Sequence, residues 1–202
     1  SETLQGRVGE TLRVSGVGTL DVAVAIRGRK TGVVERFPVA GHLGAHCPVD
    51  LSYSPSVHYT GGGPQAMADG RRGSLDFRDG AWQAVQGRDM VVTVDLGAPQ
   101  DLEQAQVQCY LYQDAWIFLP KEVRWEVSQD GDNFDVLGRS DFDDVLAPDG
   151  RQTVVPFAID GGGVKARFVR LTLVNAGVCP PWHDAATEPS WLFTDELVVL
   201  GR

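Results

Sequence analysis

The feature that most constrains this chain is an alternation of apolar and polar residues with a period of two, which recurs along most of its length. Met90 to Leu96 alternates in this way, and so do Ala105 to Tyr112 and Val123 to Val127. Successive side chains of a β-strand point to opposite faces of a sheet, so the pattern is typical of strands with one buried face. No stretch keeps a helical period. The sequence therefore predicts an all-β protein with antiparallel strands.

The alternation also predicts which side chains are buried. In Ala105–Tyr112 the inward set is Ala105, Val107, Cys109 and Leu111, and the outward set is Gln106, Gln108, Tyr110 and Tyr112. Late strands are expected at Val169–Leu173 and Leu197–Val199. A first hairpin is expected where Leu20, Val22, Val24 and Ile26 share a face, with a turn at Gly28–Gly32 and a return through Val33 to Phe37.

Two units of unequal size are expected. The first 43 or so residues supply only two or three strands, and an isolated hairpin is marginal in water, so this part must dock on another unit. His46–Pro64 contains three prolines and the run Gly61–Gly63, which is typical of a linker. We therefore expect a partial small β domain over residues 1–48 and a larger β-sandwich over residues 49–202.

Composition limits the class of partner. The 202 residues carry a formal net charge of -9 and a sequence pI near 4.8. Such a surface repels phosphate backbones and anionic lipid headgroups, which argues against nucleic acid as a partner. The apolar runs are far shorter than the ~18 residues that span a bilayer, so no membrane insertion is expected. Calcium or an uncharged ligand suits this charge better. The chain opens at Ser1 without a Met, which we interpret as a mature or excised fragment.

The cysteines and histidines give little sign of a metal or catalytic site. Cys47, Cys109 and Cys179 lie far apart with no CxxC motif, so zinc has weak support. Cys109 is expected to be a buried free thiol, while a bridge between Cys47 and Cys179 stays open. The four histidines show no HxH or HxxxH spacing of a zinc hydrolase.

An ordered series of segments resembles the discoidin, or coagulation-factor type C, family, whose sugar-binding members include the family 32 carbohydrate-binding modules. The segments are Met67–Gly70 (MADG), Trp82, Val92–Gly97 (VTVDLG), Val127–Gly138 (VSQDGDNFDVLG), Ala166–Leu173 (ARFVRLTL) and Asp195–Val199 (DELVV). The resemblance implies an eight-stranded antiparallel jelly-roll sandwich, often with a structural calcium and a shallow sugar site at one end.

A narrower likeness points to a parent enzyme. Tyr59–Gln83, Asp114–Gly131 and Trp182–Leu197 resemble the C-terminal module of Bacteroidetes-type family 20 β-N-acetylhexosaminidases, which are chitobiase-like, and Gly18–Gly44 resembles the end of the small β domain before it. This implies a secreted, periplasmic or cell-surface protein whose catalytic domain belongs to the same polypeptide. The chain is too short for that ~250-residue barrel and shows no βα alternation, so hydrolysis is expected to be absent here.

The family position implies a calcium site. Asp69 and Glu196 would each supply a carboxylate, and backbone carbonyls near Arg72, Ser74 and Ala81 would complete the shell of six to eight oxygens that Ca²⁺ takes. One departure is Gly80, where the family usually has Thr or Ser. The alternative is an acidic turn solvated by water, with Asp69 as a cap.

Candidate sugar-binding residues come from three loops. Aromatic faces stack on pyranose rings, and sugar hydroxyls need polar partners. The candidates are Trp182, His183, Trp116, Arg78 and Asp76. For Trp116, and for Trp191, core packing is the competing interpretation. Trp182 follows Pro180 and Pro181, which stiffen its approach and favour exposure.

Three functions remain open at this point. The first is a carbohydrate-binding module that holds the parent enzyme at terminal sugars of a glycan. The second is a structural domain that packs on the catalytic barrel without contacting substrate. The third is adhesion to protein or membrane through exposed apolar loop tips, for which no paired loop-tip Leu or Phe with basic neighbours is evident.

Overall fold

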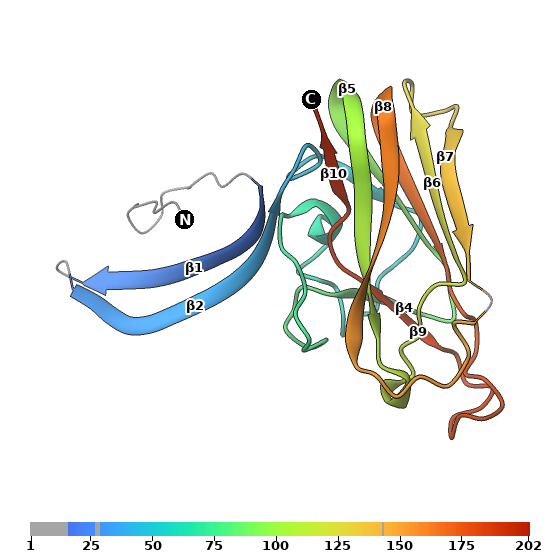
Figure 1. The fold of residues 1–202 in the computed structure, drawn as a ribbon. Helices are drawn as coiled ribbons and strands as arrows, with labels where there is room; N and C mark the ends of the chain where they lie inside the picture. Colours follow the sequence, from blue (N-terminus) through green and yellow to red (C-terminus); the bar gives the residue numbers. More distant parts are fainter. Residues whose placement is uncertain (1–15, 27–28, 143) are drawn as a thin grey trace.

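The computed structural model describes residues 16–26, 29–142 and 144–202, and it contains two separate sheets. The first sheet is the ribbon of β1 (Gly16–Ile26) and β2 (Arg29–Gly41), which stands away from the rest in Figure 1. The predicted hairpin is confirmed, but its turn is shorter than Gly28–Gly32, because pairing continues to Ile26 with Arg29. The side chains of Leu20, Val22, Val24 and Ile26 lie outside the described ones.

The second sheet has eight strands, and their pairing is antiparallel throughout. Its path runs β4-β9-β5-β8-β6-β7, with β3 and β10 also paired to β5. The strands are β3 (Val49–Leu51), β4 (Gln83–Gln86), β5 (Met90–Leu111), β6 (Glu122–Ser128), β7 (Asp135–Asp141), β8 (Thr153–Val174), β9 (Trp191–Thr194) and β10 (Val198–Gly201). The predicted all-β, eight-stranded fold is confirmed.

Two long strands turn one sheet into an open sandwich. β5 and β8 pair from Met90 with Leu173 to Leu111 with Thr153, and the register shifts between Asp95 and Gln100 and again between Leu102 and Gln104. Both strands bend over at the top of Figure 1, so each runs through both layers. At this bend the backbone of Gly161 lies so close to Leu102 that an added Cβ would be 2.4 Å from the Leu102 carbonyl oxygen. The fold needs glycine there.

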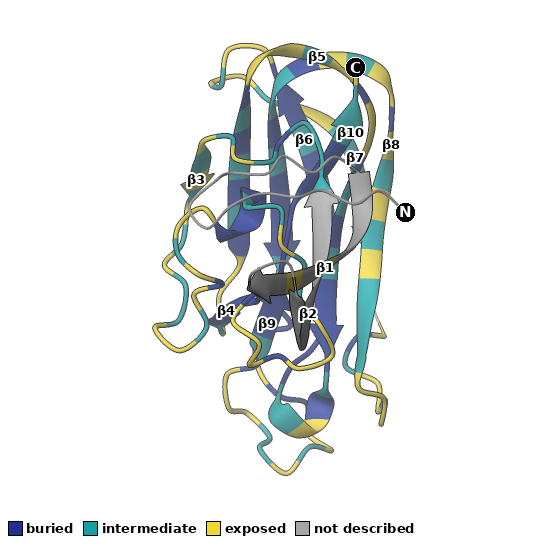
Figure 2. Cartoon of the chain, turned by 90° about the vertical axis from the view of Figure 1, so that its left-hand side faces the viewer, coloured by how far each residue is buried: buried dark blue, intermediate teal, exposed yellow. Residues whose placement is uncertain are grey.

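The core lies between the two layers and follows the predicted alternation. The inner strands are buried and the loops are exposed in Figure 2. Ala105, Val107, Cys109 and Leu111 are buried as predicted, and so are the inward residues of Met90–Leu96, Val123–Val127 and Val169–Leu173. Tyr110 is an exception, because this predicted outward residue is completely buried. A loop covers the outer face of β5 at that point, as described below.

The stretch that follows the β1–β2 ribbon is part of the sandwich. The Leu43 amide donates to the Val199 carbonyl at 2.9 Å, and the His46 amide bonds the Ala68 carbonyl. Val49–Leu51, within the predicted linker, pairs with β5. His46–Pro64 is therefore more ordered than a linker, because its backbone groups find partners in the sandwich. The boundary at residue 48 stays a prediction.

Helical structure in the described residues consists of two short 3₁₀ turns, η1 (Ala66–Ala68) and η2 (Gln113–Ala115). In that part of the chain no helix has the length and apolar character to span a bilayer. Cys47, Cys109 and Cys179 are all free thiols, so the alternative of a Cys47–Cys179 bridge is not realised. The expectation for Cys109, a buried free thiol, is confirmed.

Candidate functional site

A hollow of about 530 Å³ lies between two loops of the sandwich, and we call it the loop-end hollow. One loop follows β3 and the other joins η1 to β4. The hollow is lined by His58, Tyr59, Thr60, Gly61, Gly62, Phe77, Arg78, Gly80 and Trp82. Its volume falls within the range of roughly 300–1,000 Å³ that is typical of small-molecule sites.

Side chains from the sandwich hold the second loop in place. The Trp82 indole N–H donates to the Ser74 carbonyl at 3.1 Å, and the Tyr110 hydroxyl donates to the Leu75 carbonyl. Gln152, from the segment before β8, adds a second bond to Leu75 at 3.0 Å. These bonds bury Tyr110 and explain why an outward strand position lacks solvent. The loop is therefore fixed before any ligand arrives, which lowers the ordering cost of binding.

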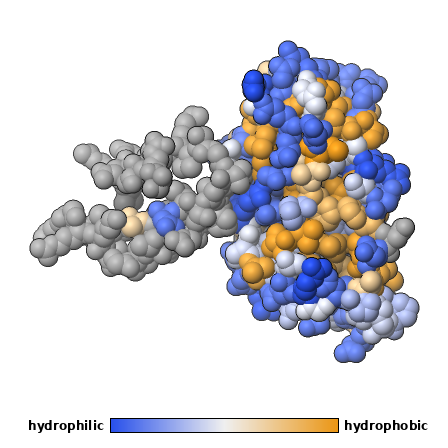
Figure 3. Space-filling model, in the orientation of Figure 1, coloured by the Kyte–Doolittle hydropathy of each residue, from blue (hydrophilic) through white to orange (hydrophobic). Residues whose placement is uncertain are grey.

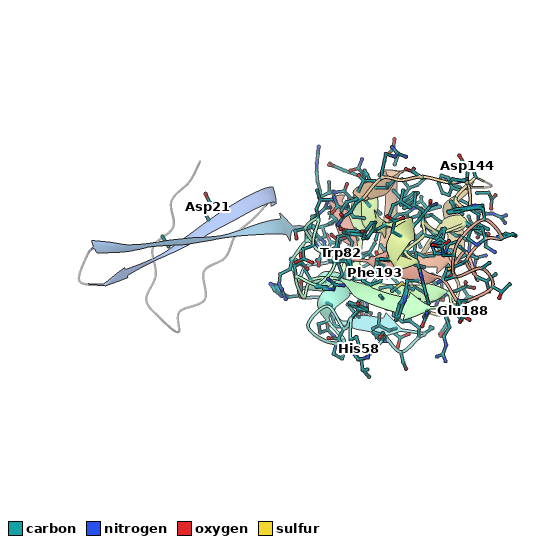
Figure 4. All side chains as sticks on the ribbon, turned by 90° about the horizontal axis from the view of Figure 1, so that it is seen from below. Asp21, His58, Trp82, Asp144, Glu188 and Phe193 are labelled. Atoms are coloured by element: carbon teal, nitrogen blue, oxygen red, sulfur yellow. The ribbon has the colours of Figure 1, made fainter. Side chains whose placement is uncertain are left out.

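An aromatic cluster forms the floor of the loop-end hollow. The rings of Tyr59 and Phe193 have centroids 4.7 Å apart, and Tyr59 and Phe77 are 6.0 Å apart. Trp82 meets Tyr110 edge to face at 5.1 Å and is only 1% exposed. Figure 4 shows Trp82 and Phe193 inside the end of the sandwich and His58 at its margin. Tyr59 is half-buried and lines the hollow.

The rim of the loop-end hollow is polar. His58, Thr60 and Arg78 are exposed, and the Arg78 guanidinium lies over the Phe77 ring at 4.6 Å from its centroid. Asp76 accepts the Arg78 amide at 3.0 Å, which makes a local turn. Apolar ring faces beside hydrogen-bonding groups are what a sugar needs, because a pyranose has C–H faces and a belt of hydroxyls.

The structure divides the five predicted sugar-binding residues into two groups. Arg78 lines the loop-end hollow, with Asp76 two residues before it. Trp182, His183 and Trp116 lie around the 179–190 loop instead, and none of them lines that hollow. In Figure 4, Glu188 marks this loop at a different margin from His58. The predicted residues therefore do not form one site.

In the second group most polar atoms already have hydrogen-bond partners within the protein, and the exposed Trp182 ring is the part that a ligand could contact. Trp182 is 44% exposed, but its indole N–H donates to the Leu146 carbonyl at 2.7 Å. His183 Nε2 lies 2.8 Å from the Gln113 carbonyl oxygen, and Nδ1 accepts the Ala185 amide. With both ring nitrogens occupied, His183 does not fit its predicted role of bonding a sugar hydroxyl. Trp116 is half-buried in an apolar cluster around Phe118.

The predicted calcium residues lie beside the same η1–β4 loop. Glu196 is completely buried, and its Oε1 is 2.6 Å from His42 Nε2 and 3.0 Å from the Gly70 amide, while Oε2 accepts the Asp69 amide. His42 Nδ1 accepts the Val199 amide, so Nε2 carries the ring proton and donates it to Glu196. This contact joins the stretch after β2 to the sandwich.

A half-buried arginine, Arg72, lies in the same group. Arg72 Nε and Nη2 and Asp195 Oδ1 are buried and have no hydrogen-bond partner among the described residues. The Gln108 amide, oriented with its nitrogen toward Asp195, joins Arg72 Nη1 to Asp195 Oδ2 with two bonds of 2.9 Å. Burial raises the pKa of Asp195 to about 7 and that of Glu196 to about 8, against the opposing charge of Arg72. Burial and Arg72 together lower the pKa of His42 to about 4.

These residues do not fit a calcium shell in the arrangement that the structure shows. Calcium is bound by oxygens that face the ion. Here the loop turns the amides of Asp69, Gly70 and Gly73 toward carboxylates, and the Ser74 carbonyl accepts the Trp82 indole. Asp69 Oδ1 accepts the Arg71 amide. Among the described residues no group of three His, Cys, Asp or Glu side chains is placed to hold a metal.

Sequence comparison places this architecture in a family. A family model for the F5/8 type C domain matches residues 52–192, which is more than half of the chain. The chain belongs to the F5/8 type C domain family. The match spans both loops of the loop-end hollow, so the hollow is part of this F5/8 type C domain. No curated protein matches the chain.

Solved structures of similar fold include sugar-binding modules. A fucose-binding module of Streptococcus pneumoniae is 14% identical with a TM-score of 0.51, covering 80% of this chain and 95% of that one. A second, SpX-3, is 16% identical with a TM-score of 0.52, covering 80% and 98%. The Clostridium perfringens module CBM32-5, in complex with GalNAc-β-1,3-galactose, is 16% identical with a TM-score of 0.46, covering 76% and 94%. The similarity to the two fucose-binding modules confirms the discoidin-like fold.

Sequence reasoning missed part of the hollow. His58, Tyr59 and Thr60 fall in the stretch interpreted as a linker, and Phe77 had no predicted role. A usable signal was present, since an aromatic residue and a histidine precede the Gly61–Gly63 run. Pairing this segment with the Asp76–Gly80 loop requires the fold, because the sequence does not show that the Tyr59 and Phe77 rings meet.

Proposed function

We propose that this F5/8 type C domain is a non-catalytic carbohydrate-binding module and that the loop-end hollow is its sugar site. The observation that carries the proposal is the half-buried Tyr59, backed by the buried Phe77 and Trp82, beneath a rim of His58, Thr60 and Arg78, on loops held by the sandwich. A ring face stacks on a pyranose, and the rim groups bond its hydroxyls. One stacked ring with two or three hydrogen bonds gives affinity of about 1 mM.

The biological setting follows from the resemblance to β-N-acetylhexosaminidases. In this proposal the module belongs to a chitobiase-like glycoside hydrolase that is secreted, periplasmic or at the cell surface. Its partners are a glycan or terminal monosaccharide and the catalytic domain of the same polypeptide. The β1–β2 ribbon supports this, because its two strands pair only with each other in the described part of the chain, and such ribbons need a further surface to be stable.

Two other functions make different predictions. A purely structural domain would leave the loop-end hollow without a ligand. Adhesion has one observation in its favour, since Val57 and Leu75 are exposed on the loops beside the hollow, at 86% and 60%. The net charge of -9 opposes binding to anionic vesicles. Sedimentation of the chain with phosphatidylserine vesicles, without retention by any glycan, would favour adhesion.

A glycan array followed by titration tests the proposal. The 202-residue chain should be retained by at least one class of glycan. His58→Ala should weaken that binding about tenfold or more, because the exposed imidazole lines the hollow and one charge-assisted or two neutral hydrogen bonds account for that factor. Trp182→Ala is the matched control at the other loop and should leave binding unchanged. Loss of binding in Trp182→Ala alone would move the site to the 179–190 loop.

A further inference from the structure

The charges around the loop-end hollow differ from those of the whole chain. The sequence has 27 acidic and 18 basic residues. The hollow itself is lined by Arg78 and His58, and among the described residues no carboxylate side chain lines it. Figure 3 shows hydrophilic and hydrophobic residues interspersed on the face in view.

Arg78 is an uncompensated cation. It is exposed, and in the described part of the chain no carboxylate lies within ion-pair distance of its guanidinium. The nearest acidic residues along the chain are engaged elsewhere. Asp79 accepts the amides of Ser74 and Ala81, and one oxygen of Asp76 accepts the Arg78 amide. The loop thus turns its own acids toward its backbone and leaves the guanidinium without an anion.

A second hollow provides a comparison within the same molecule. It has a volume of about 510 Å³, and its charged lining residues are Lys121, Glu122, Arg139 and Asp141. There the arginine is paired, since Arg139 Nη2 bonds Asp141 at 2.8 Å and its Nε lies 3.5 Å from Glu122. The two hollows therefore differ, because the arginine of the second is paired with carboxylates and Arg78 in the loop-end hollow is not.

The place of Arg78 favours one kind of anion. Its guanidinium lies over the Phe77 ring, and Phe77 belongs to the buried aromatic cluster, so the side chain is supported. The planar fork of a guanidinium matches a planar carboxylate with two parallel hydrogen bonds. If a sugar ring lies over the aromatic floor, a carboxylate attached to that ring would lie at the rim of the hollow, beside Arg78.

We infer that the loop-end hollow recognises a sugar that carries a carboxylate, a uronic acid, with Arg78 as the residue that binds the carboxylate. This inference rests on the proposed function, because it names the class of sugar for the same site. A neutral sugar would leave the guanidinium without its anion and would use only the aromatic floor and the hydroxyl-binding groups.

Matched sugars test the inference by titration calorimetry or NMR. The probes are methyl glucuronide with methyl glucoside, and methyl galacturonide with methyl galactoside, which differ within a pair only in the carboxylate. In at least one pair the acid should bind about tenfold more tightly, as expected for a two-pronged charged contact. Arg78→Gln should abolish this preference, and Arg78→Lys should retain part of it. Arg139→Gln changes the net charge equally and should preserve the preference.

Several results would overturn the inference. They are equal or tighter binding of the neutral sugars, a preference that survives Arg78→Gln, and tighter binding of methyl galactoside 6-sulfate than of either uronide. In these cases the proposed function still stands if His58→Ala weakens the binding of the sugar that does bind. If neither the four sugars nor any arrayed glycan binds, the proposed function fails as well.

Discussion

At the scale of single residues, Arg72 and His42 decide how the buried carboxylates beside the η1–β4 loop are held. His42 donates to Glu196, and Arg72 reaches Asp195 through Gln108. A single buried carboxylate without a partner would be strongly destabilising, so positive charge or hydrogen bonds must offset its burial. In this F5/8 type C domain the donors come from the protein itself. The loop has amides and a guanidinium in the region where a calcium shell would need oxygens.

Chelation is therefore predicted to leave the melting temperature unchanged. A ligand that binds only the folded state would add RT ln(1 + [L]/Kd), about 2.7 kcal/mol at a hundredfold excess over Kd, and its removal would be easily seen. The measurement is a thermal melt with EDTA and then with excess calcium. Arg72→Met is the matched variant, and it should lower the melting temperature with or without EDTA. A melt that falls with EDTA and recovers with calcium would restore the site at Asp69 and Glu196.

At the scale of elements, the η1–β4 loop depends on one close approach. A Cβ added at Gly73 would lie 2.1 Å from Cε2 of Trp82, the side chain whose indole holds Ser74. Because Trp82 is buried among other rings, it cannot move aside freely. The loop and the floor of the hollow are thus fitted to a glycine at this position.

Gly73→Ala is expected to lower the free energy of unfolding by about 1–3 kcal/mol, the usual cost of overpacking. It should also weaken sugar binding, since the loop that carries Arg78 is displaced. Urea unfolding and titration with a bound glycan measure the two effects. Gly150→Ala is the control, because a Cβ there meets no atom within 4 Å. Equal stability of the two variants would contradict the close contact.

The strands were most predictable where one face is buried, because the sequence then keeps a strict alternation. Met90–Leu96 and Val169–Leu173 show this plainly, and their inward residues are buried. Tyr110 was misassigned because a loop distant in sequence covers it. The alternation of apolar and polar residues within a strand carries no information about such a loop. The site was harder still. Arg78 was found from its loop, but His58 and Tyr59 acquire a role only when β3 and β4 bring their loops together.

At the scale of the whole molecule, the β1–β2 ribbon is a second sheet beside the sandwich that carries the loop-end hollow. The β1–β2 ribbon leaves one side in Figure 1, and the stretch from His42 to Cys47 attaches it to β10 and η1. In the proposed function this ribbon connects to the catalytic domain, while the hollow faces a glycan. The negative charge of the chain makes a local cation such as Arg78 the main source of attraction for an acidic sugar.

Mapping of amide chemical shifts in the ¹⁵N-labelled 202-residue chain tests the central claim most directly. The chain is titrated with the sugar that binds best, and Trp182 side-chain signals are followed in the same spectra. The account predicts that the largest shifts fall on residues 58–62 and 77–82, with small changes over 179–190. Shifts centred on Trp182 and His183, with residues 58–62 and 77–82 unchanged, would contradict the account and assign sugar binding to the other loop.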